Sequence, residues 1–318
     1  MVLLLLSVFC VACRMYPRVE SYVDTQVQKA ELHGDTFVFD NASMHYWEGG
    51  DFDAPVVLFL HGFGGDALWA WSRNLADFTE QYHVIAPDLL WFGESTSQEI
   101  SLQQQIDTLL ALLANKGIEK ISIVGLSYGG FVALGMTEHI VVDKMVLVGV
   151  GSSVYDVQDV QALQDKFSVD TIEDIFVPRD TTDIHRLLDI CFYFPTNLIP
   201  KNLQRDLYQN VFGKYPQEQR QLITELVTNM EKHNNMFVPP NKQTDYLLIL
   251  GKYDPFFTIE QARILQSNLD AELSVYSRAA HVPNVGYKRK FAKEVLHFLN
   301  TKDDSVRIKI DSTSNHEE

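Results

Sequence analysis

The chain has 318 residues, of which 46% are hydrophobic and 21% charged, and this composition indicates a globular protein with a sizeable core. Its formal net charge of −16 at pH 7 argues against a basic surface for nucleic acid or an anionic membrane, but leaves small molecules and neutral lipids as partners. The three cysteines give no disulfide framework, and the sequence lacks the spaced His, Cys and acidic residues of metal sites, so we expect neither a metal nor another cofactor.

Residues 1–13 form an apolar leader that ends at Cys13. The run is too short to span a bilayer and is typical of a signal peptide, and Val11-Ala12-Cys13 resembles a bacterial lipoprotein cleavage site. No basic residue precedes the run, whereas Arg14 follows it, which is the wrong charge asymmetry for export. Three interpretations stay open: a lipoprotein of the cell envelope, an uncleaved leader that associates with a membrane, and a cytoplasmic protein.

The first strands follow the leader. Residues 36–39 and 44–47 flank a turn and predict an antiparallel hairpin at the edge of a sheet. Residues 55–60 predict a buried strand that runs into the glycine-rich loop 61–65, with the sequence HGFGG. Such a loop lets backbone amides approach developing negative charge, and the Phe63 amide is the candidate donor. The alternative is a glycine-rich turn with a packed histidine.

Ser127 lies in the pentapeptide GLSYG at residues 125–129. The apolar, β-branched run 120–124 predicts a strand directly before it, and a helix is expected to begin at Tyr128. A strand, a sharp turn and a helix would project the serine hydroxyl above the sheet edge, with the Tyr128 amide as a second donor. An ordinary strand-to-helix turn is the alternative interpretation.

Strands and helices alternate along residues 36–150 and 244–301, which predicts an α/β fold with a mainly parallel, doubly wound sheet. The expected helices cover residues 68–80, 102–116, 128–139, 259–269 and 288–299.

The alternation stops at residues 151–243, after the sixth strand, where polar helical sequence predicts an inserted helical lid. Within it, Phe192 and Phe194 belong to an apolar and aromatic run. We expect these two rings, with Trp69 and Trp71 from below, to line an acyl-binding slot. The competing interpretation is that they only pack the lid onto the core.

Two more polar residues follow predicted strands of the second core segment. Asp254 comes just after the strand at 246–251, and His281 comes just after the strand at 273–276. The carboxyl ends of parallel strands meet at one sheet edge, which is where open α/β sheets place their sites. A serine needs a base that accepts its proton and an acid that orients the base, so we expect His281 and Asp254 to serve Ser127, with Asp156 as the fallback acid. The polar tail 302–318 is expected to be disordered.

In these motifs and their order, the chain resembles the α/β-hydrolase fold superfamily over about residues 36 to 301. The loop 86–95, with the sequence APDLLWFGES, also matches, although Leu90-Trp91 stands where many members have Pro-Gly. The chain is most similar to lipases and esterases of the monoacylglycerol-lipase type and to C–C bond hydrolases. Epoxide hydrolases and haloalkane dehalogenases have an aspartate where this chain has Ser127, so an acyl-enzyme is the expected intermediate.

The resemblance implies a serine hydrolase that acts on small-molecule or lipid esters of carboxylic acids. Ser127 would attack, His281 oriented by Asp254 would transfer protons, and the amides of Phe63 and Tyr128 would hold the oxyanion. Two alternatives stay open, namely a C–C bond hydrolase with the same triad and a non-enzymatic ligand receptor on a hydrolase scaffold.

Overall fold

A computed structural model describes residues 16–151, 157–194, 196–234 and 244–301 of the chain. The leader 1–13 with Cys13, the fallback acid Asp156 and the tail 302–318 lie outside these ranges. In the described ranges, no helix is long and apolar enough to cross a membrane.

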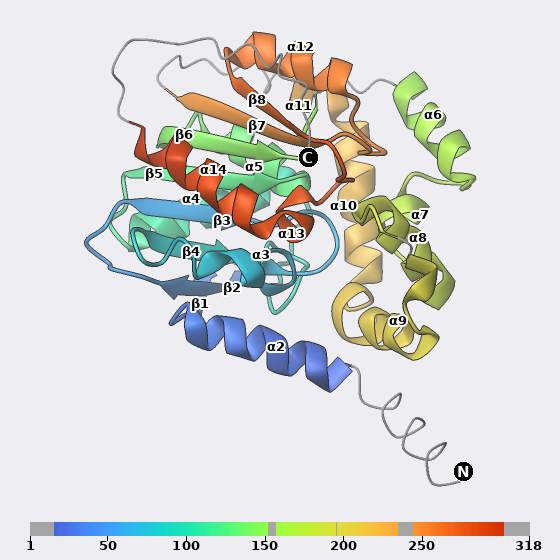
Figure 1. The fold of residues 1–318 in the computed structure, drawn as a ribbon, viewed down its shortest axis with the longest axis horizontal. Coiled ribbons are helices and arrows are strands. Elements are labelled where there is room, and N and C mark those ends of the chain that lie inside the picture. The colour runs from blue at the N-terminus through green and yellow to red at the C-terminus, as the bar shows by residue number, and fades with distance from the viewer. Residues whose placement is uncertain (1–15, 152–156, 195, 235–243, 302–318) are drawn as a thin grey trace, which may run out of the picture.

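The centre of the fold is an eight-stranded sheet with the order β1-β2-β4-β3-β5-β6-β7-β8. The strands are β1 (His33–Phe39), β2 (Ala42–Gly49), β3 (Val56–Leu60), β4 (His83–Pro87), β5 (Lys120–Leu126), β6 (Val141–Val148), β7 (Asp245–Gly251) and β8 (Glu272–Tyr276). β1 and β2 form the predicted antiparallel hairpin, β2 pairs antiparallel with β4, and the remaining pairs are parallel. The carboxyl ends of the parallel strands therefore share one edge, on the right in Figure 1.

Helices cover both faces of the sheet (Figure 1). They are α3 (Ala67–Leu75), α4 (Leu102–Asn115), α5 (Tyr128–Met136), α12 (Ile259–Leu269), α13 (Pro283–Gly286) and α14 (Lys288–Asn300). Trp71 of α3 and Phe291 of α14 belong to the hydrophobic cluster on one face, and Leu109 of α4 and Val132 of α5 belong to the cluster on the other. The doubly wound α/β fold predicted from the sequence is thus confirmed. α3 ends five residues earlier than expected, because the chain turns at Ala76–Phe78.

Between β6 and β7 lies a helical insertion, which lies beside the carboxyl edge of the sheet (Figure 1). Its elements are α6 (Val157–Phe167), α7 (Glu173–Phe176), α8 (Thr181–Cys191), the 3₁₀ turn η1 (Thr196–Leu198), α9 (Lys201–Leu207), the π-helical turn η2 (Tyr208–Phe212), α10 (Pro216–Thr228) and α11 (Met230–Asn234).

Two buried carboxylates tie the insertion together. Asp174 forms an ion pair with Arg220 of α10, and Asp183 accepts a 2.7 Å hydrogen bond from Arg186. Arg179 reaches both carboxylates, at 3.5 Å and 3.2 Å. The side chains of Asp174 and Asp183 are 6% and 7% exposed, so the arginines compensate charges that are largely removed from water.

A helix that the sequence pattern did not predict, α2 (Tyr16–Lys29), precedes β1. It packs against α3 and α9, and its residues Val19, Tyr22 and Val23 face a cavity described below. The helix has no fully buried residue, which explains why its apolar stripe is too thin to stand out in the sequence.

Candidate active site

Ser127 occupies a strained turn between β5 and α5. Its backbone has φ 48° and ψ −114°, a conformation that L residues rarely adopt. A Cβ on Gly125 would lie 2.7 Å from the Gly129 carbonyl oxygen, and a Cβ on Gly129 would lie 2.4 Å from the Leu60 oxygen. The two glycines therefore let β5, α5 and β3 approach closely enough to hold the serine above the sheet edge.

His281 and Asp254 form a buried pair at the same edge. His281 Nδ1 lies 2.8 Å from Asp254 Oδ2, and the two side chains are 7% and 0% exposed. The other carboxylate oxygen, Oδ1, accepts the amides of Phe256 at 2.8 Å and Phe257 at 3.1 Å. With the carboxylate fixed by two backbone donors, the imidazole is held with its Nδ1 toward Asp254 and its Nε2 free for another partner.

Strand β6 brings the serine and the histidine to one place. The Ser127 amide donates a 2.8 Å hydrogen bond to the Val148 carbonyl at the end of β6. The next residue, Gly149, has φ 59°, and a Cβ there would lie 3.1 Å from the His281 ring. Gly149 is a site residue that the sequence reading missed, and its only signal was the glycine that ends a predicted strand.

Ser127 and His281 both line one cavity of about 270 Å³. Within the described residues, the Ser127 side chain makes no capping hydrogen bond to the start of α5.

The glycine-rich loop after β3 lies against the serine. A Cβ on Gly62 would lie 3.4 Å from the Ser127 Cβ. Within the described part of the chain, the amides of Phe63 and Tyr128 donate no backbone hydrogen bond, so both remain free as donors. They fit the requirement for fixed N–H groups beside a nucleophile.

His61 holds this loop in place instead of reacting. Its Nε2 accepts the Leu89 amide at 2.9 Å, so the proton lies on Nδ1, which donates to the Gly62 carbonyl at 2.8 Å. Burial lowers the pKa of His61, which keeps the ring neutral.

The departure from Pro-Gly after Leu89 is accommodated by strain at Trp91, whose φ is 71°. The Trp91 amide donates to the Ser95 carbonyl, and the Trp91 carbonyl accepts a hydrogen bond from Gln219 of the insertion. Asp88 supports the same loop by accepting the Glu94 amide at 3.0 Å. These contacts hold Trp91 in a backbone conformation that usually needs glycine.

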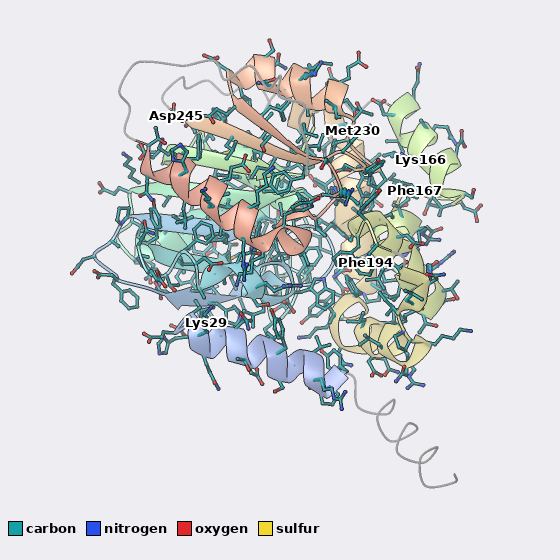
Figure 2. All side chains as sticks on the ribbon, viewed as in Figure 1. Lys29, Lys166, Phe167, Phe194, Met230 and Asp245 are labelled. Carbon is teal, nitrogen blue, oxygen red and sulfur yellow. The ribbon has the colours of Figure 1, made fainter. Side chains whose placement is uncertain are left out.

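A second, smaller cavity of about 160 Å³ also reaches Ser127. Phe63, Phe176 and Phe256 line both cavities, so their rings separate them beside the serine. The smaller cavity has apolar walls from α6, α10 and α11, and Figure 2 shows Met230 of α11 between the carboxyl ends of the strands and α6. The sequence reading missed Phe176 and Phe256, because nothing local distinguishes a cavity wall from a core residue.

Of the four residues expected to line an acyl-binding slot, two line a cavity and two do not. Trp69 and Phe192 line the larger cavity. Trp71 is fully buried in the core, where its ring packs on Phe59 and Phe291. It lies two residues from Trp69 on α3, and residues at that spacing point to different sides of a helix.

Phe194 also departs from the expected slot. Its ring is 50% exposed and lies 5.0 Å from the Phe192 ring between centroids. Phe194, labelled in Figure 2, lines neither cavity. The structure therefore brings one residue of each expected pair to the cavity and leaves the other outside. In the described ranges, no group of three or more His, Cys, Asp and Glu side chains is placed to hold a metal ion.

Comparison with known proteins identifies relatives of the whole core. A family model for the alpha/beta hydrolase fold matches residues 55–285. A 2-hydroxy-6-oxononadienedioate/2-hydroxy-6-oxononatrienedioate hydrolase from Pseudomonas sp is 26% identical over 273 residues, which cover 81% of this chain and 92% of that protein. Lipase 1 from Psychrobacter immobilis is 26% identical over 76% of both chains.

Solved structures have the same architecture. A membrane phospholipase A, described as a bacterial virulence factor, has a TM-score of 0.75 at 23% identity, over 94% of this chain and 96% of that one. A likeness at this level of identity concerns the fold.

Proposed function

The chain belongs to the α/β-hydrolase fold family, and on that premise we propose that it is a serine hydrolase that cleaves carboxylic esters through an acyl-enzyme. The observation that carries the proposal is the convergence of a strained serine with a buried histidine and aspartate 2.8 Å apart at one sheet edge. Two free amides beside the serine add the donors that acyl transfer needs.

In this proposal, His281 Nε2 accepts the Ser127 proton while the serine oxygen attacks the ester carbonyl. Asp254 keeps the proton on Nδ1 and stabilises the imidazolium that forms. The amides of Phe63 and Tyr128 hold the oxyanion, and one such donor is typically worth about 10²–10³ in rate. The imidazolium then protonates the leaving alcohol, and the same histidine activates water for deacylation.

The two cavities suggest how an ester would lie. His281 must reach the leaving oxygen, so the alcohol belongs in the larger cavity, which His281 lines. The acyl group then belongs in the smaller cavity, which is lined by Tyr128 and reaches Ser127 from the other side of Phe63. An apolar acyl cavity and a more polar alcohol cavity fit a lipid or small-molecule ester.

Hydrolysis of a C–C bond next to a ketone is the second candidate. It uses the same serine and histidine, and it is favoured by the similarity to the nonadienedioate hydrolase over most of both chains. Activity on a vinylogous diketone without activity on 4-nitrophenyl esters would decide for this candidate.

The test of the proposal is labelling with a fluorophosphonate, followed by turnover of a 4-nitrophenyl ester panel. We expect the wild type to be labelled and the Ser127→Ala variant to lose labelling and turnover, by up to about 10⁶ in kcat. Ser21→Ala, at an exposed serine on α2, is the matched control and should keep both. A labelled peptide without residue 127, or full turnover by Ser127→Ala, would refute the proposal. Ligand binding without any turnover would favour a receptor.

We also propose that the helical insertion at residues 151–243 acts as a lid over both cavities. α6, α7, α10 and α11 supply walls of the smaller cavity, and α7, α8 and η2 supply walls of the larger one. Attachment of the leader to a membrane stays a prediction from the sequence. Mass spectrometry of the mature N-terminus tests it, and an unmodified Met1 would contradict a lipid anchor at Cys13.

A further inference from the structure

One wall of the larger cavity comes from α2, the helix that precedes the sheet. Val19, Tyr22 and Val23 of α2 line this cavity together with Ser127 and His281. The three α2 residues have the spacing i, i+3 and i+4, which places them on one face of the helix. The larger cavity therefore extends from the serine to α2.

Both ends of α2 are anchored in the molecule. At its start, Tyr16 packs against the hydrophobic cluster formed by α8, α9 and η2 of the insertion. Near its end, Val27 packs against the core cluster that contains Trp71. The turn after α2 lies close to β2, where a Cβ on Gly49 would be 3.1 Å from the Glu31 carbonyl oxygen. α2 therefore bridges the sheet and the insertion, and Figure 1 shows it running from β1 toward α9.

The middle of α2 presents apolar side chains to the cavity. Val19 and Val23 are partly buried, whereas Thr25 on the other side of the helix is exposed. Apolar side chains on a cavity wall gain dispersion contacts and lose exposed area when a ligand group packs against them. The two valines therefore favour an apolar ligand group that is long enough to reach α2.

We propose that α2 sets the size of the alcohol group of the substrate, with Val19 and Val23 as specificity-determining residues. This inference rests on the proposed ester hydrolysis and deepens it, because it names the class of alcohol. The cavity of about 270 Å³ is larger than an engineered apolar cavity of roughly 150 Å³ that binds benzene, so it suits up to about ten carbon atoms. The substrates are therefore esters of apolar alcohols of medium length, such as octanol.

The preference follows from the reach of the alcohol. A butyl group would leave the α2 valines without a ligand contact, whereas an octyl group would pack against them. A single methylene in an apolar pocket is worth about 10-fold or more in selection, so we expect at least that preference for the octyl ester. Because α2 precedes the region 55–285 that the family model matches, the preference would be a property of the N-terminal segment and not of the matched core.

A pair of butyrate esters tests the inference on the full-length protein, with the release of butyric acid followed by titration. We expect the wild-type kcat/KM to be about 10-fold higher for octyl butyrate than for butyl butyrate, and a ratio of one or less would overturn the inference. In Val23→Phe, the larger side chain would occupy the space of the outer methylenes and should remove the preference. Thr25→Phe adds the same ring on the exposed side of α2 and should keep the wild-type ratio. An unchanged ratio in Val23→Phe would also overturn the inference.

The smaller side chain of Val23→Ala should act in the opposite direction. It should raise the ratio of kcat/KM between decyl and octyl butyrate by about 10-fold, so the inference stays falsifiable even if Val23→Phe does not fold. The ratio between ethyl octanoate and ethyl butyrate, which differ in the acyl group, should not respond to either variant. A change in that acyl ratio with a constant alcohol ratio would overturn the assignment of α2 to the alcohol group.

Binding separates failure of this inference from failure of the proposed function. In the Ser127→Ala protein, addition of Val23→Phe should weaken the binding of octyl butyrate about 10-fold, as measured by calorimetry. Ester turnover in the wild type with no effect of Val23→Phe on binding or on the alcohol ratio would refute the role of α2 alone. Weakened binding without any ester turnover in the wild type would refute ester hydrolysis and leave α2 as the wall of a ligand site.

Discussion

The edge of the sheet and the helical insertion fix their polar residues in different ways. At the sheet edge, backbone amides hold the carboxylates in place. Asp254 accepts hydrogen bonds from two amides, and Asp88 accepts hydrogen bonds from the amides of Ala67 and Glu94. In the insertion, the carboxylate of Asp174 is instead compensated by arginine side chains. These donor amides lie in loops that follow strands or at the start of α3, close to the sheet, whereas the long arginine side chains depend on how separate helices pack.

This difference leads us to expect that the sheet edge carries the chemistry and that the helical insertion selects the ligand. The serine, the histidine and the free amides lie just past strand ends, so the register of the paired strands sets their positions. The smaller cavity is lined by α6, α10 and α11, whose side chains can change without disturbing the pairing of the strands. Substitutions at the sheet edge should therefore lower activity, whereas substitutions in the insertion should change stability or ligand preference.

The largest expected effect is at the sheet edge. Asp254→Asn should lower kcat by about 10⁴ with little change in the melting temperature, because the amide stabilises the wrong imidazole tautomer. Asp245→Asn at the start of β7, where the aspartate is half-exposed, is the control and should stay near wild type. A loss below 10-fold in kcat for Asp254→Asn would turn attention to Asp156 as the orienting acid.

Removal of an ion pair in the insertion should lower the stability of the protein and leave the catalytic step intact. Asp174→Ala leaves Arg220 and Arg179 without their shared carboxylate, and we expect a loss of about 3 kcal/mol in the free energy of unfolding. Hydrogen exchange should speed up in α7, α8 and α10 and stay slow in β5 and β6. Asp165→Ala, at an exposed aspartate of α6, is the control. Equal acceleration in sheet and insertion would mean that the two regions open as one unit.

Asp66, the N-cap of α3, should make the stability of the protein depend on pH. Burial, and next the Asp88 charge, raise the pKa of Asp66 from 3.8 to about 6. The folded state binds the proton more tightly, so this contribution to stability is full below about pH 4 and is lost as the pH rises to about 6. The change is roughly 3 kcal/mol, since each pKa unit is worth about 1.4 kcal/mol.

Melting temperatures between pH 4 and 7 check this prediction. Asp66→Asn keeps an acceptor for the Trp69 amide and should remove the decline, which makes the variant relatively more stable at pH 7. The exposed Asp53→Asn is the control. Parallel pH profiles for Asp66→Asn and the wild type would contradict the raised pKa.

The smallest expected effect concerns the larger cavity, the proposed site of the alcohol group. Phe192→Ala widens the larger cavity near Trp69 and should shift the ratio of kcat/KM between a bulky and a small alcohol about 10-fold toward the bulky one. Phe52→Ala, at an exposed ring far along the chain, should leave the ratio unchanged. An unchanged ratio in Phe192→Ala, with a lower melting temperature, would show that the ring only packs the insertion onto the core.

Sequence patterns predicted the sheet, the hairpin and the place of each candidate catalytic residue, because each depends on local order. A strand followed by GLSYG, or a strand followed by Asp254, specifies a position at the sheet edge without knowledge of any distant contact. The 2.8 Å contact between His281 and Asp254 follows from the parallel pairing of β7 with β8. The strands and the polar residues that follow them are both visible in the sequence.

The cavity walls could not be read in the same way. Trp69 and Trp71 are the same residue type two positions apart, and only the rotation of α3 against the sheet sends one to the cavity and the other into the core. Gly149 and α2 escaped notice for the same reason, since their importance comes from what packs against them.

The order of strands, turns and polar residues was thus determined by the sequence itself, because backbone hydrogen bonding and hydrophobic periodicity act over a few residues. The shape of the two cavities, and which side chains line them, were decided by the tertiary structure alone. The cavity walls depend on how helices far apart in the chain fit together, and close packing makes each wall position depend on its neighbours.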